Sequence, residues 1–255
     1  MNASAVVAPA GYERLTIGDA VVVTRVAAAS GFRAALLAAP TMHEWAAAMP
    51  GAEPFQGRTT AWGVRLPGGA IDVVVRHGRR GGLLAAVRGD RFMWPGRAPW
   101  ELDASLRLQD AGVRTPDVVG FVIYPAGPGL CRCDVATRRL PTGAEFPLAW
   151  AGADERARGE IVVAVGTLLR DLRSAGARHA DLNAKNLYLA REDGRWHAWV
   201  LDVDRVQFGT ADHVDVGTQN LARLDRSIRK LRERGALAVD DAALDRLGAL
   251  ATEHA

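Results

Sequence analysis

The stretch His179-Ala180-Asp181-Leu182-Asn183-Ala184-Lys185-Asn186 decides the fold class of this 255-residue chain. Before it, residues 154–175 repeat apolar side chains at the spacing of one helix face, and after it, residues 186–190 form a short apolar run typical of a strand. A further apolar run, 196–203, carries Asp202 near its end. The chain therefore places a polar loop between a helix and a strand, and an acidic residue near the end of the next strand.

The polar residues of this loop match the pattern H-x-D-L-x-x-x-N, which is typical of kinase catalytic loops. Phosphoryl transfer needs in-line positioning and neutralisation of phosphate charge. We therefore expect Asp181 to be the catalytic base, and Asn186 and Asp202 to hold Mg²⁺ against the phosphates of ATP. We expect His179 to brace the loop, and Asn183 to orient Asp181 or to contact the transferred phosphate. The alternative is that these residues decorate a turn, as Asp and Asn often do.

The chain before residue 140 is predicted to be rich in strands. The elements expected there are extended structure over 12–29, a helix over 31–49, a hairpin over 59–78 with its turn at 67–69, a helix over 100–111 ended by Gly112, and strands over 118–124 and 131–140. This part is expected to form a β-rich N-lobe, residues 1–139, that covers the nucleotide.

The chain after residue 140 is predicted to be mostly helical. The elements expected there are a helix over 154–175 ended by Gly176, strands over 186–190 and 196–203 joined by a turn at 192–194, and helices over 217–233 and 240–253. Residues 140–255 are then a helical, catalytic C-lobe. The fold class expected is α+β, a protein-kinase-like two-lobe fold with a cleft between the lobes, the two lobes together making one kinase domain.

The N-lobe should supply a cation for the phosphates of ATP and an acidic helix partner. Arg76 ends the second strand of the predicted hairpin and is expected to bind the α- and β-phosphates while pairing with Glu101. Gly57, Thr59 and Thr60, just before the first hairpin strand, are expected to contact phosphate through backbone N–H groups. The alternatives are an exposed strand end for Arg76, a charge favoured by the helix dipole for Glu101, and a plain turn at 57–60.

A basic segment follows the hairpin. His77, Arg79 and Arg80 are the candidate substrate residues, because an arginine-rich segment beside the cleft suits an anionic acceptor or a membrane surface. Other basic and aromatic residues flank them in the sequence: Arg88, Arg91, Phe92 and Trp94. The alternative is a solvated basic loop.

Composition narrows the class of protein. Hydrophobic residues make up 49% and charged residues 24%, which is typical of a soluble globular chain and argues against extended disorder. The net charge of +3, with a pI of about 9.2, is too small to indicate a nucleic-acid partner. No nucleic acid is expected to bind.

The expected location follows from the cysteines and from the apolar runs. Cys131 and Cys133 lie two apart on one predicted strand, a poor geometry for a disulfide, so both are expected to be free thiols in a reducing compartment. Residues 1–11 lack the features of a signal peptide. The longest apolar run, 118–130, is too short and too broken by Pro and Gly to span a bilayer. The chain is expected to be cytoplasmic or peripherally bound to a membrane.

Several motifs together resemble the lipopolysaccharide kinases, and among them those that act on 3-deoxy-D-manno-octulosonic acid (Kdo). The loop 179–186 looks very like the catalytic loop of that family, and Asn220-Leu221-Ala222-Arg223-Leu224-Asp225-Arg226-Ser227 is similar to its following helix. Arg76-His77 with Arg80-Gly81-Gly82-Leu83, and the stretch 109–116, resemble its N-lobe. The similarity runs from about Gly57 to Lys230. It departs at Lys185, where a His is usual, and at Val203, where an aromatic residue is usual.

The resemblance implies an acceptor and a place in the cell. It implies transfer of the γ-phosphate of ATP, with Mg²⁺, to the 4-hydroxyl of the Kdo sugar of Kdo-lipid A during lipopolysaccharide core biosynthesis. It also implies a Gram-negative cell and a peripheral position on the cytoplasmic face of the inner membrane.

Other functions are weighed against this one. A protein kinase is disfavoured, because only about a dozen residues separate Asp204 from the closing helix and no A-P-E triplet occurs. An aminoglycoside-phosphotransferase-like enzyme would need an acidic acceptor pocket, which the Arg79-Arg80 segment argues against. A heptose kinase and a non-catalytic pseudokinase complete the alternatives; the pseudokinase is disfavoured because the base and both metal ligands are present.

Overall fold

The structure is a computed structural model that describes residues 6–56, 59–69, 71–79, 89–209 and 213–252. The chain divides into two compact units, residues 1–103 with 117–139 and residues 104–116 with 140–255. Compared with the expected lobes, 1–139 and 140–255, the second unit gains residues 104–116. The physical reason is packing, because Ala104, Leu108 and Val113 are buried in the hydrophobic core of the second unit.

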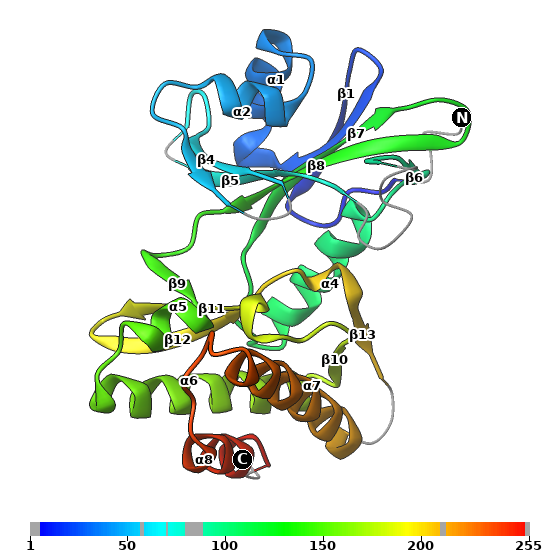
Figure 1. The fold of residues 1–255 in the computed structure, drawn as a ribbon. Coiled ribbons are helices and arrows are strands. Elements are labelled where there is room, and N and C mark those ends of the chain that lie inside the picture. The colour runs from blue at the N-terminus through cyan, green and yellow to red at the C-terminus, as the bar shows by residue number, and fades with distance from the viewer. Residues whose placement is uncertain (1–5, 57–58, 70, 80–88, 210–212, 253–255) are drawn as a thin grey trace. The chain divides into compact units, whose positions relative to one another are not determined.

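The first unit is built on one eight-stranded sheet (Figure 1). Its strands are β1 (Tyr12–Ile17), β2 (Ala20–Arg25), β3 (Glu53–Phe55), β4 (Ala61–Arg65), β5 (Asp72–His77), β6 (Phe92–Met93), β7 (Val118–Pro125) and β8 (Leu130–Arg138). Seven of them follow the order β1-β2-β7-β8-β5-β4-β3, and β6 pairs with β8 outside this path. Every pairing is antiparallel. The predicted hairpin (β4 and β5) and the two later strands (β7 and β8) are confirmed.

Two helices, α1 (Ala29–Ala38) and α2 (Met42–Ala48), cover the sheet where one helix over 31–49 was expected. That expectation is wrong because Pro40 lacks an N–H group and disfavours helical backbone at Ala39, which is extended with φ −149° and ψ 157°. Thr41 then caps α2, and its side chain accepts a hydrogen bond from the Glu44 N–H at 3.0 Å. Phe32 and Met42 from these helices are fully buried in the core of the first unit.

Helix α4 (Ala98–Asp110) confirms the helix expected over 100–111. Gly112 follows it with φ +78°, the left-handed backbone that commonly ends a helix. The two cysteines of β8 are buried and free, as expected from their spacing. Burial raises the pKa of Cys131 to about 11 and that of Cys133 to about 12, so both thiols are poor nucleophiles.

The second unit is mainly helical (Figure 1). Besides the end of α4 it holds α5 (Phe146–Ala151), α6 (Glu155–Ser174), α7 (His213–Glu233) and α8 (Asp241–Thr252), with the short strands β9 (Gly143–Glu145), β10 (Ala177–His179), β11 (Leu187–Glu192), β12 (Arg195–Val200) and β13 (Val206–Phe208). The apolar face predicted for 154–175 is buried in the core of this unit. The DG turn between β11 and β12 has positive φ at both residues, Asp193 and Gly194, as a tight hairpin requires.

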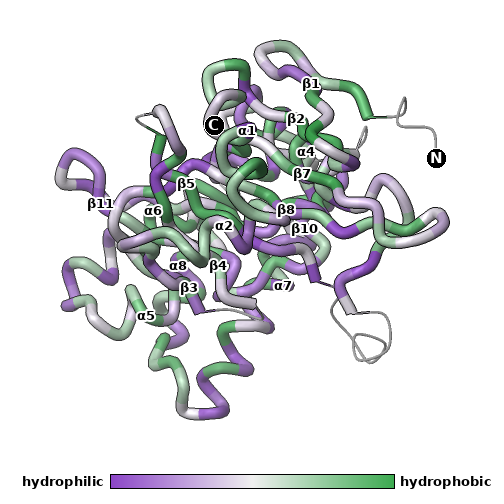
Figure 2. The backbone as a smooth tube through the Cα atoms, turned by 90° about the horizontal axis from the view of Figure 1, so that it is seen from above, coloured by the Kyte–Doolittle hydropathy of each residue, from purple (hydrophilic) through white to green (hydrophobic). Residues whose placement is uncertain are grey.

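Apolar and polar stretches alternate along the chain, as the backbone coloured by hydropathy shows (Figure 2). No helix among the described residues is long and apolar enough to cross a membrane.

Candidate active site

The catalytic-loop motif lies between β10 and β11 of the second unit. β10 pairs with β13 in antiparallel fashion, with His179 opposite Val206, so the loop and the chain that follows Asp202 are joined by a small sheet. A short 3-10 turn, Ala184–Asn186, ends the loop and leads into β11. This arrangement brings residues 179–186 and Asp202 together, although they are separated by two strands in the sequence.

His179 links the catalytic loop to the backbone next to Asp202. Its side chain is fully buried; Nε2 donates to the Leu201 carbonyl at 3.0 Å, and Nδ1 accepts from the Asp181 N–H at 3.2 Å. Because one ring nitrogen donates and the other accepts, the imidazole is neutral, and burial lowers the pKa of His179 accordingly. His179 therefore lies where a bracing residue is expected, on the protein side of the loop.

Asn183 and Asn186 fix the backbone around Asp181. Both side-chain amides donate from Nδ2 to the Asp181 carbonyl at 2.9 Å. The Oδ1 of Asn183 also accepts from the Lys185 N–H at 3.0 Å, which caps the 3-10 turn. Of the two roles expected for Asn183, this geometry favours orienting Asp181, because both ends of its amide contact the loop.

Asp202 lies two residues past the end of β12, with φ 58° and ψ 49°. A left-handed conformation at a residue other than glycine costs on the order of 1–2 kcal/mol, and such strain gathers at functional sites. Buried Val203 follows, while the Asp202 side chain stays exposed. The backbone strain thus turns the Asp202 carboxylate outward from the core of the second unit.

The donor set of Asn186 and Asp202 fits Mg²⁺. An amide oxygen and a carboxylate are hard ligands, and Mg²⁺ usually binds through one or two protein groups together with waters and substrate phosphates. Among the residues that the structure describes, no group of three or more His, Cys, Asp or Glu could hold a metal ion by itself. Metal binding by Asn186 and Asp202 remains a prediction.

Helix α7 is hydrogen-bonded to the catalytic loop through two residues that lie outside the catalytic-loop motif. Buried Asn220 accepts from the His179 N–H at 3.0 Å and donates to the Ala177 carbonyl at 2.8 Å. Ser227 accepts from the Ala184 N–H at 3.1 Å. Asn220 and Ser227 are seven positions apart and so lie on one face of α7. The sequence signal that could have identified both residues is this spacing within the stretch 220–227, which was noted for its family resemblance.

In the first unit, Arg76 on β5 forms an ion pair with Glu101 in the first turn of α4. The pairing expected between these residues is present, and Glu101 is 5% exposed, so it is more than a charge on a helix surface. A buried carboxylate fixes the guanidinium in direction. Binding of phosphate by Arg76 remains a prediction.

The phosphate-contacting loop is only partly described, because Gly57 lies outside the described residues. Thr59 and Thr60 lie between β3 and β4 and are half-buried. The Thr60 carbonyl accepts from His43 Nε2 at 2.8 Å, which ties this loop to α2. Contact of these residues with phosphate remains a prediction.

His77, a candidate for acceptor binding, instead joins two carboxylates. Nδ1 lies 2.6 Å from Asp134 Oδ1, and Nε2 lies 3.1 Å from Asp90 Oδ2. Since both partners accept, both ring nitrogens donate and His77 is an imidazolium; its hydrogen bond with Asp134 is the main cause of its raised pKa. Both ring nitrogens thus have partners within the first unit, and contact of His77 with an acceptor remains a prediction. Arg79 is exposed, and Arg80 lies outside the described residues.

Asp134 on β8 is the centre of a network of hydrogen bonds in the first unit. It is 1% exposed, and its Oδ2 accepts from the His43 N–H at 2.9 Å and from the Tyr124 hydroxyl at 3.0 Å. Tyr124 in turn accepts from the Met42 N–H at 2.8 Å. The start of α2 is thus hydrogen-bonded to the strand pair β7–β8.

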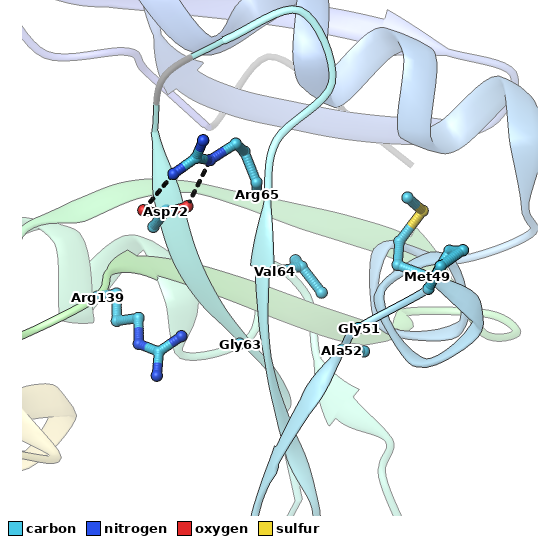
Figure 3. A pocket seen from close by; sticks show the side chains of 9 residues that line it. Met49, Gly51, Ala52, Gly63, Val64, Arg65, Asp72 and Arg139 are labelled. Atoms are coloured by element: carbon cyan, nitrogen blue, oxygen red, sulfur yellow. Dashed lines mark hydrogen bonds and ion pairs between the residues drawn. The ribbon is translucent and has the colours of Figure 1, made fainter.

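The first unit also contains a hollow of about 260 Å³ (Figure 3). It is lined by Met49, Pro50, Gly51, Ala52, Gly63, Val64, Arg65, Asp72 and Arg139. Two hydrogen bonds of 2.8 and 3.1 Å join Arg65 to Asp72 on its wall, and Arg139 pairs with Glu53. Of the predicted site residues that the structure describes, none lines this hollow.

Comparison with known proteins decides the family. The family model described as "Lipopolysaccharide kinase (Kdo/WaaP) family" matches residues 44–244. The chain belongs to this family. A 3-deoxy-D-manno-octulosonic acid kinase from Stenotrophomonas maltophilia (strain K279a) is 33% identical over 197 residues, which cover 74% of this chain and 73% of that protein. One from Vibrio parahaemolyticus serotype O3:K6 is 28% identical over 179 residues, 68% of this chain and 71% of that protein.

A solved structure supports the fold. The one described as "WaaP in complex with acyl carrier protein" matches with a TM-score of 0.52 and 18% identity, over 83% of this chain and 82% of that chain. The chain therefore has the protein-kinase-like fold that its catalytic-loop motif predicts, and it is an ATP-dependent kinase of the lipopolysaccharide kinase family. The family match begins inside α2, so β1, β2 and α1 lie outside it.

Proposed function

We propose that this kinase transfers the γ-phosphate of ATP to a hydroxyl of the Kdo sugar of Kdo-lipid A, the 4-hydroxyl, in lipopolysaccharide core biosynthesis. The observation that carries the proposal is an ordered H-x-D-L-x-x-x-N loop, with Asp202 beside it, in a chain of this family. Relatives that share about 30% of its residues are named as Kdo kinases. Because the acceptor is a lipid, we place the enzyme at the cytoplasmic face of the inner membrane.

The residues of the chain divide the work. Asp181, held by its backbone on both sides, accepts the proton of the attacking hydroxyl. Arg76, directed by Glu101, binds the α- and β-phosphates. Asn186 and Asp202 hold Mg²⁺, which when bound neutralises charge on the phosphates. Positioning and charge neutralisation supply the catalysis, since phosphoryl transfer needs little covalent help.

Label transfer tests the acceptor. The purified chain is incubated with [γ-³²P]ATP and Mg²⁺, and with Kdo-lipid A, lipid A lacking Kdo, kanamycin or a generic protein in separate reactions. Label on Kdo-lipid A alone is the expected result, and Asp181→Asn should remove it. Label on lipid A lacking Kdo, or on kanamycin, would overturn the proposed acceptor, and mass spectrometry of the product then identifies the phosphorylated sugar and hydroxyl.

A second candidate acceptor is a heptose of the lipopolysaccharide core. The family description covers both Kdo and WaaP proteins, and WaaP is the source of a structure similar to this chain. Core oligosaccharides that carry Kdo alone or Kdo with heptose distinguish the two. Phosphate on the heptose and none on Kdo would support this second acceptor.

A further inference from the structure

Helix α7 and the catalytic loop lie side by side in the second unit, and two hydrogen bonds fix their register. Asn220 accepts from the His179 N–H at 3.0 Å, and Ser227, seven positions later, accepts from the Ala184 N–H at 3.1 Å. The helix and the loop therefore advance in the same direction between these two bonds. Residues of α7 midway between Asn220 and Ser227 lie at the level of Asp181, the expected base.

Arg223 and Leu224 are the two midway residues, and they lie on opposite sides of the line from Asn220 to Ser227. Each residue turns an α-helix by about 100°, which places Arg223 about 60° to one side of Asn220 and Leu224 about 40° to the other. Leu224 is fully buried in the core of the second unit. Arg223 is half-buried, so its side of α7 is the one that opens to solvent beside the loop.

Arg223 has no anionic partner within the described part of the chain. No hydrogen bond or ion pair involves its side chain there, and none joins it to Asp181. The carboxylate nearest to it along the helix, Asp225, instead accepts from Arg229 Nε at 2.8 and 3.0 Å. An unpaired guanidinium beside a catalytic loop suits a ligand anion that offers two acceptor oxygens.

Two kinds of anion enter the site of this kinase, the phosphates of ATP and the acid group of the proposed acceptor. The phosphates already have Mg²⁺, held by Asn186 and Asp202, and Arg76 as their expected partners. Kdo is an acid whose carboxylate is attached to C2 of the sugar ring, with one ring carbon between C2 and the C4 that carries the proposed reactive hydroxyl. With this hydroxyl at Asp181, the carboxylate lies within reach of a long side chain that starts beside the loop.

We propose that Arg223 binds the carboxylate of the Kdo acceptor and thereby selects the hydroxyl that reaches Asp181. This assignment rests on the proposed function, in which the acceptor is Kdo. A planar guanidinium binds a carboxylate through two parallel hydrogen bonds, which fix the orientation of the sugar as well as its position. A heptose without a carboxylate offers no such group, so Arg223 also favours Kdo over the second candidate acceptor.

Binding of soluble Kdo derivatives tests the assignment without turnover. The probes are the methyl glycoside of Kdo and the methyl ester of that glycoside, in which the acid group is uncharged. Each is titrated into the full chain with Mg²⁺ and a non-hydrolysable ATP analogue. The test variants are Arg223→Gln, which removes the charge, and Arg223→Lys, which keeps the charge but not the planar group. The control is Arg246→Gln, since Arg246 is exposed on α8 and lies next to Gly159 of α6.

We expect Arg223→Gln to weaken binding of the acid about 10- to 100-fold, the usual effect of losing hydrogen bonds between charged groups. Arg223→Lys should weaken it less, and Arg246→Gln should bind as the parent does. The parent should prefer the acid over the ester by a similar factor, and Arg223→Gln should bind both alike. The proposal is overturned by a parent without this preference, or by an Arg223→Gln variant that keeps it. Thermal unfolding verifies that the variants are folded; if Arg223→Gln is not, Arg223→Lys carries the same comparison.

Turnover separates this inference from the proposed function. With Kdo-lipid A, Arg223→Gln should raise the KM for the acceptor and leave the KM for ATP unchanged. A rise in the KM for ATP alone would show that Arg223 binds phosphate, and the proposal would fail. If the parent phosphorylates Kdo-lipid A and the variant keeps both KM values, the proposed function stands and the assignment of Arg223 fails. If the variant loses the preference for the acid but the parent phosphorylates no Kdo acceptor, the assignment stands and the proposed reaction fails.

Discussion

The catalytic loop of the second unit and the β5–α4 region of the first unit are held in place by different interactions. Neutral groups hold the loop: the His179 imidazole, the Asn220 amide and the Ser227 hydroxyl. Ion pairs hold the β5–α4 region, defined as Arg76, His77 and Glu101 with Asp134: Arg76 to Glu101 and His77 to Asp134.

The difference has consequences for how each region responds to its surroundings. Hydrogen bonds between neutral buried groups respond little to salt, and losing one partner leaves the other unsatisfied. Buried ion pairs depend on the protonation of both partners, and their net effect on stability is small until one partner is removed. The base of the reaction thus sits on a support of neutral groups, and the expected phosphate-binding arginine on a support of ion pairs.

The largest expected effect separates chemistry from nucleotide binding. Asp181→Asn keeps the shape of the loop and removes the base, so turnover should fall roughly 10²- to 10⁴-fold. The affinity for ATP should stay nearly unchanged, because the base acts on the acceptor and not on the nucleotide. Kinetics with Kdo-lipid A and calorimetric titration with ATP check both parts. Wild-type turnover in this variant would reject Asp181 as the base.

Breaking the neutral support should be the next largest effect. Asn220→Leu leaves the His179 N–H and the Ala177 carbonyl without a partner, at a cost of about 2–4 kcal/mol in the free energy of unfolding. Asn220→Asp keeps an acceptor for the His179 N–H, but it replaces the donor to the Ala177 carbonyl with a carboxylate oxygen, which cannot donate.

Denaturant unfolding of both Asn220 variants measures the loss. The neighbouring change Gln219→Leu is the control, since its partners Arg178 and Asp215 lie nearer the surface. A loss no greater for Asn220→Leu than for this control would contradict the anchoring role of Asn220.

Removing the charge of Glu101 tests the ionic support. In Glu101→Gln the side chain keeps its size, but Arg76 loses an anionic partner, which should cost about 1–3 kcal/mol. The KM for ATP should rise while the catalytic step changes less, because the base is unaffected. Asp103→Asn on the same helix is the control, since that carboxylate is exposed. Identical KM values for both variants would argue against a phosphate-binding role for Arg76.

The smallest effect is a pH dependence with opposite signs in the two regions. The pKa of His77 is raised in the folded state, so its contribution to stability is complete below the unfolded value of 6.5 and is lost as pH rises through the folded value. The pKa of His179 is lowered, so its contribution is present above 6.5 and is lost as pH falls through the folded value.

Amide hydrogen exchange at several pH values resolves the two regions. Protection of β5 should decrease as pH rises above 6.5, with a slope of at most about 1.4 kcal/mol per pH unit for one proton, and His77→Gln should remove this decrease. Protection of the catalytic loop should decrease as pH falls below 6.5. The same sign in both regions would contradict the protonation states inferred from the hydrogen bonds.

Much of the fold could be predicted from the sequence, because its signals are local. The apolar face of α6, the DG turn before β12 and the glycines that end α4 and α6 each act over a few residues. Pro40 also indicated a break between α1 and α2, but the apolar pattern on both sides of it favoured a single helix. Strand β6 could not be predicted, since two residues carry no periodicity and their pairing with β8 is long-range.

The site shows the same limit. The motif placed Asp181, Asn183, Asn186 and Asp202 on one loop and one strand end, because their spacing is fixed along the chain. The role of His77 could not be read in this way, since its partners Asp134 and Asp90 come from distant segments. Only the folded chain brings a carboxylate to each ring nitrogen, buried Asp134 to Nδ1 and half-buried Asp90 to Nε2.

The hairpin β1–β2 lies outside the span that matches the family, yet β2 pairs with β7 inside the sheet. A chain shortened to residues 44–244 would lose that partner. One side of β7, a mostly apolar strand, would then present unpaired N–H and C=O groups to solvent, and such an edge can pair with a strand of another molecule. We expect such a shortened chain to aggregate. The N-terminal hairpin thus protects the edge of β7 from pairing with other molecules.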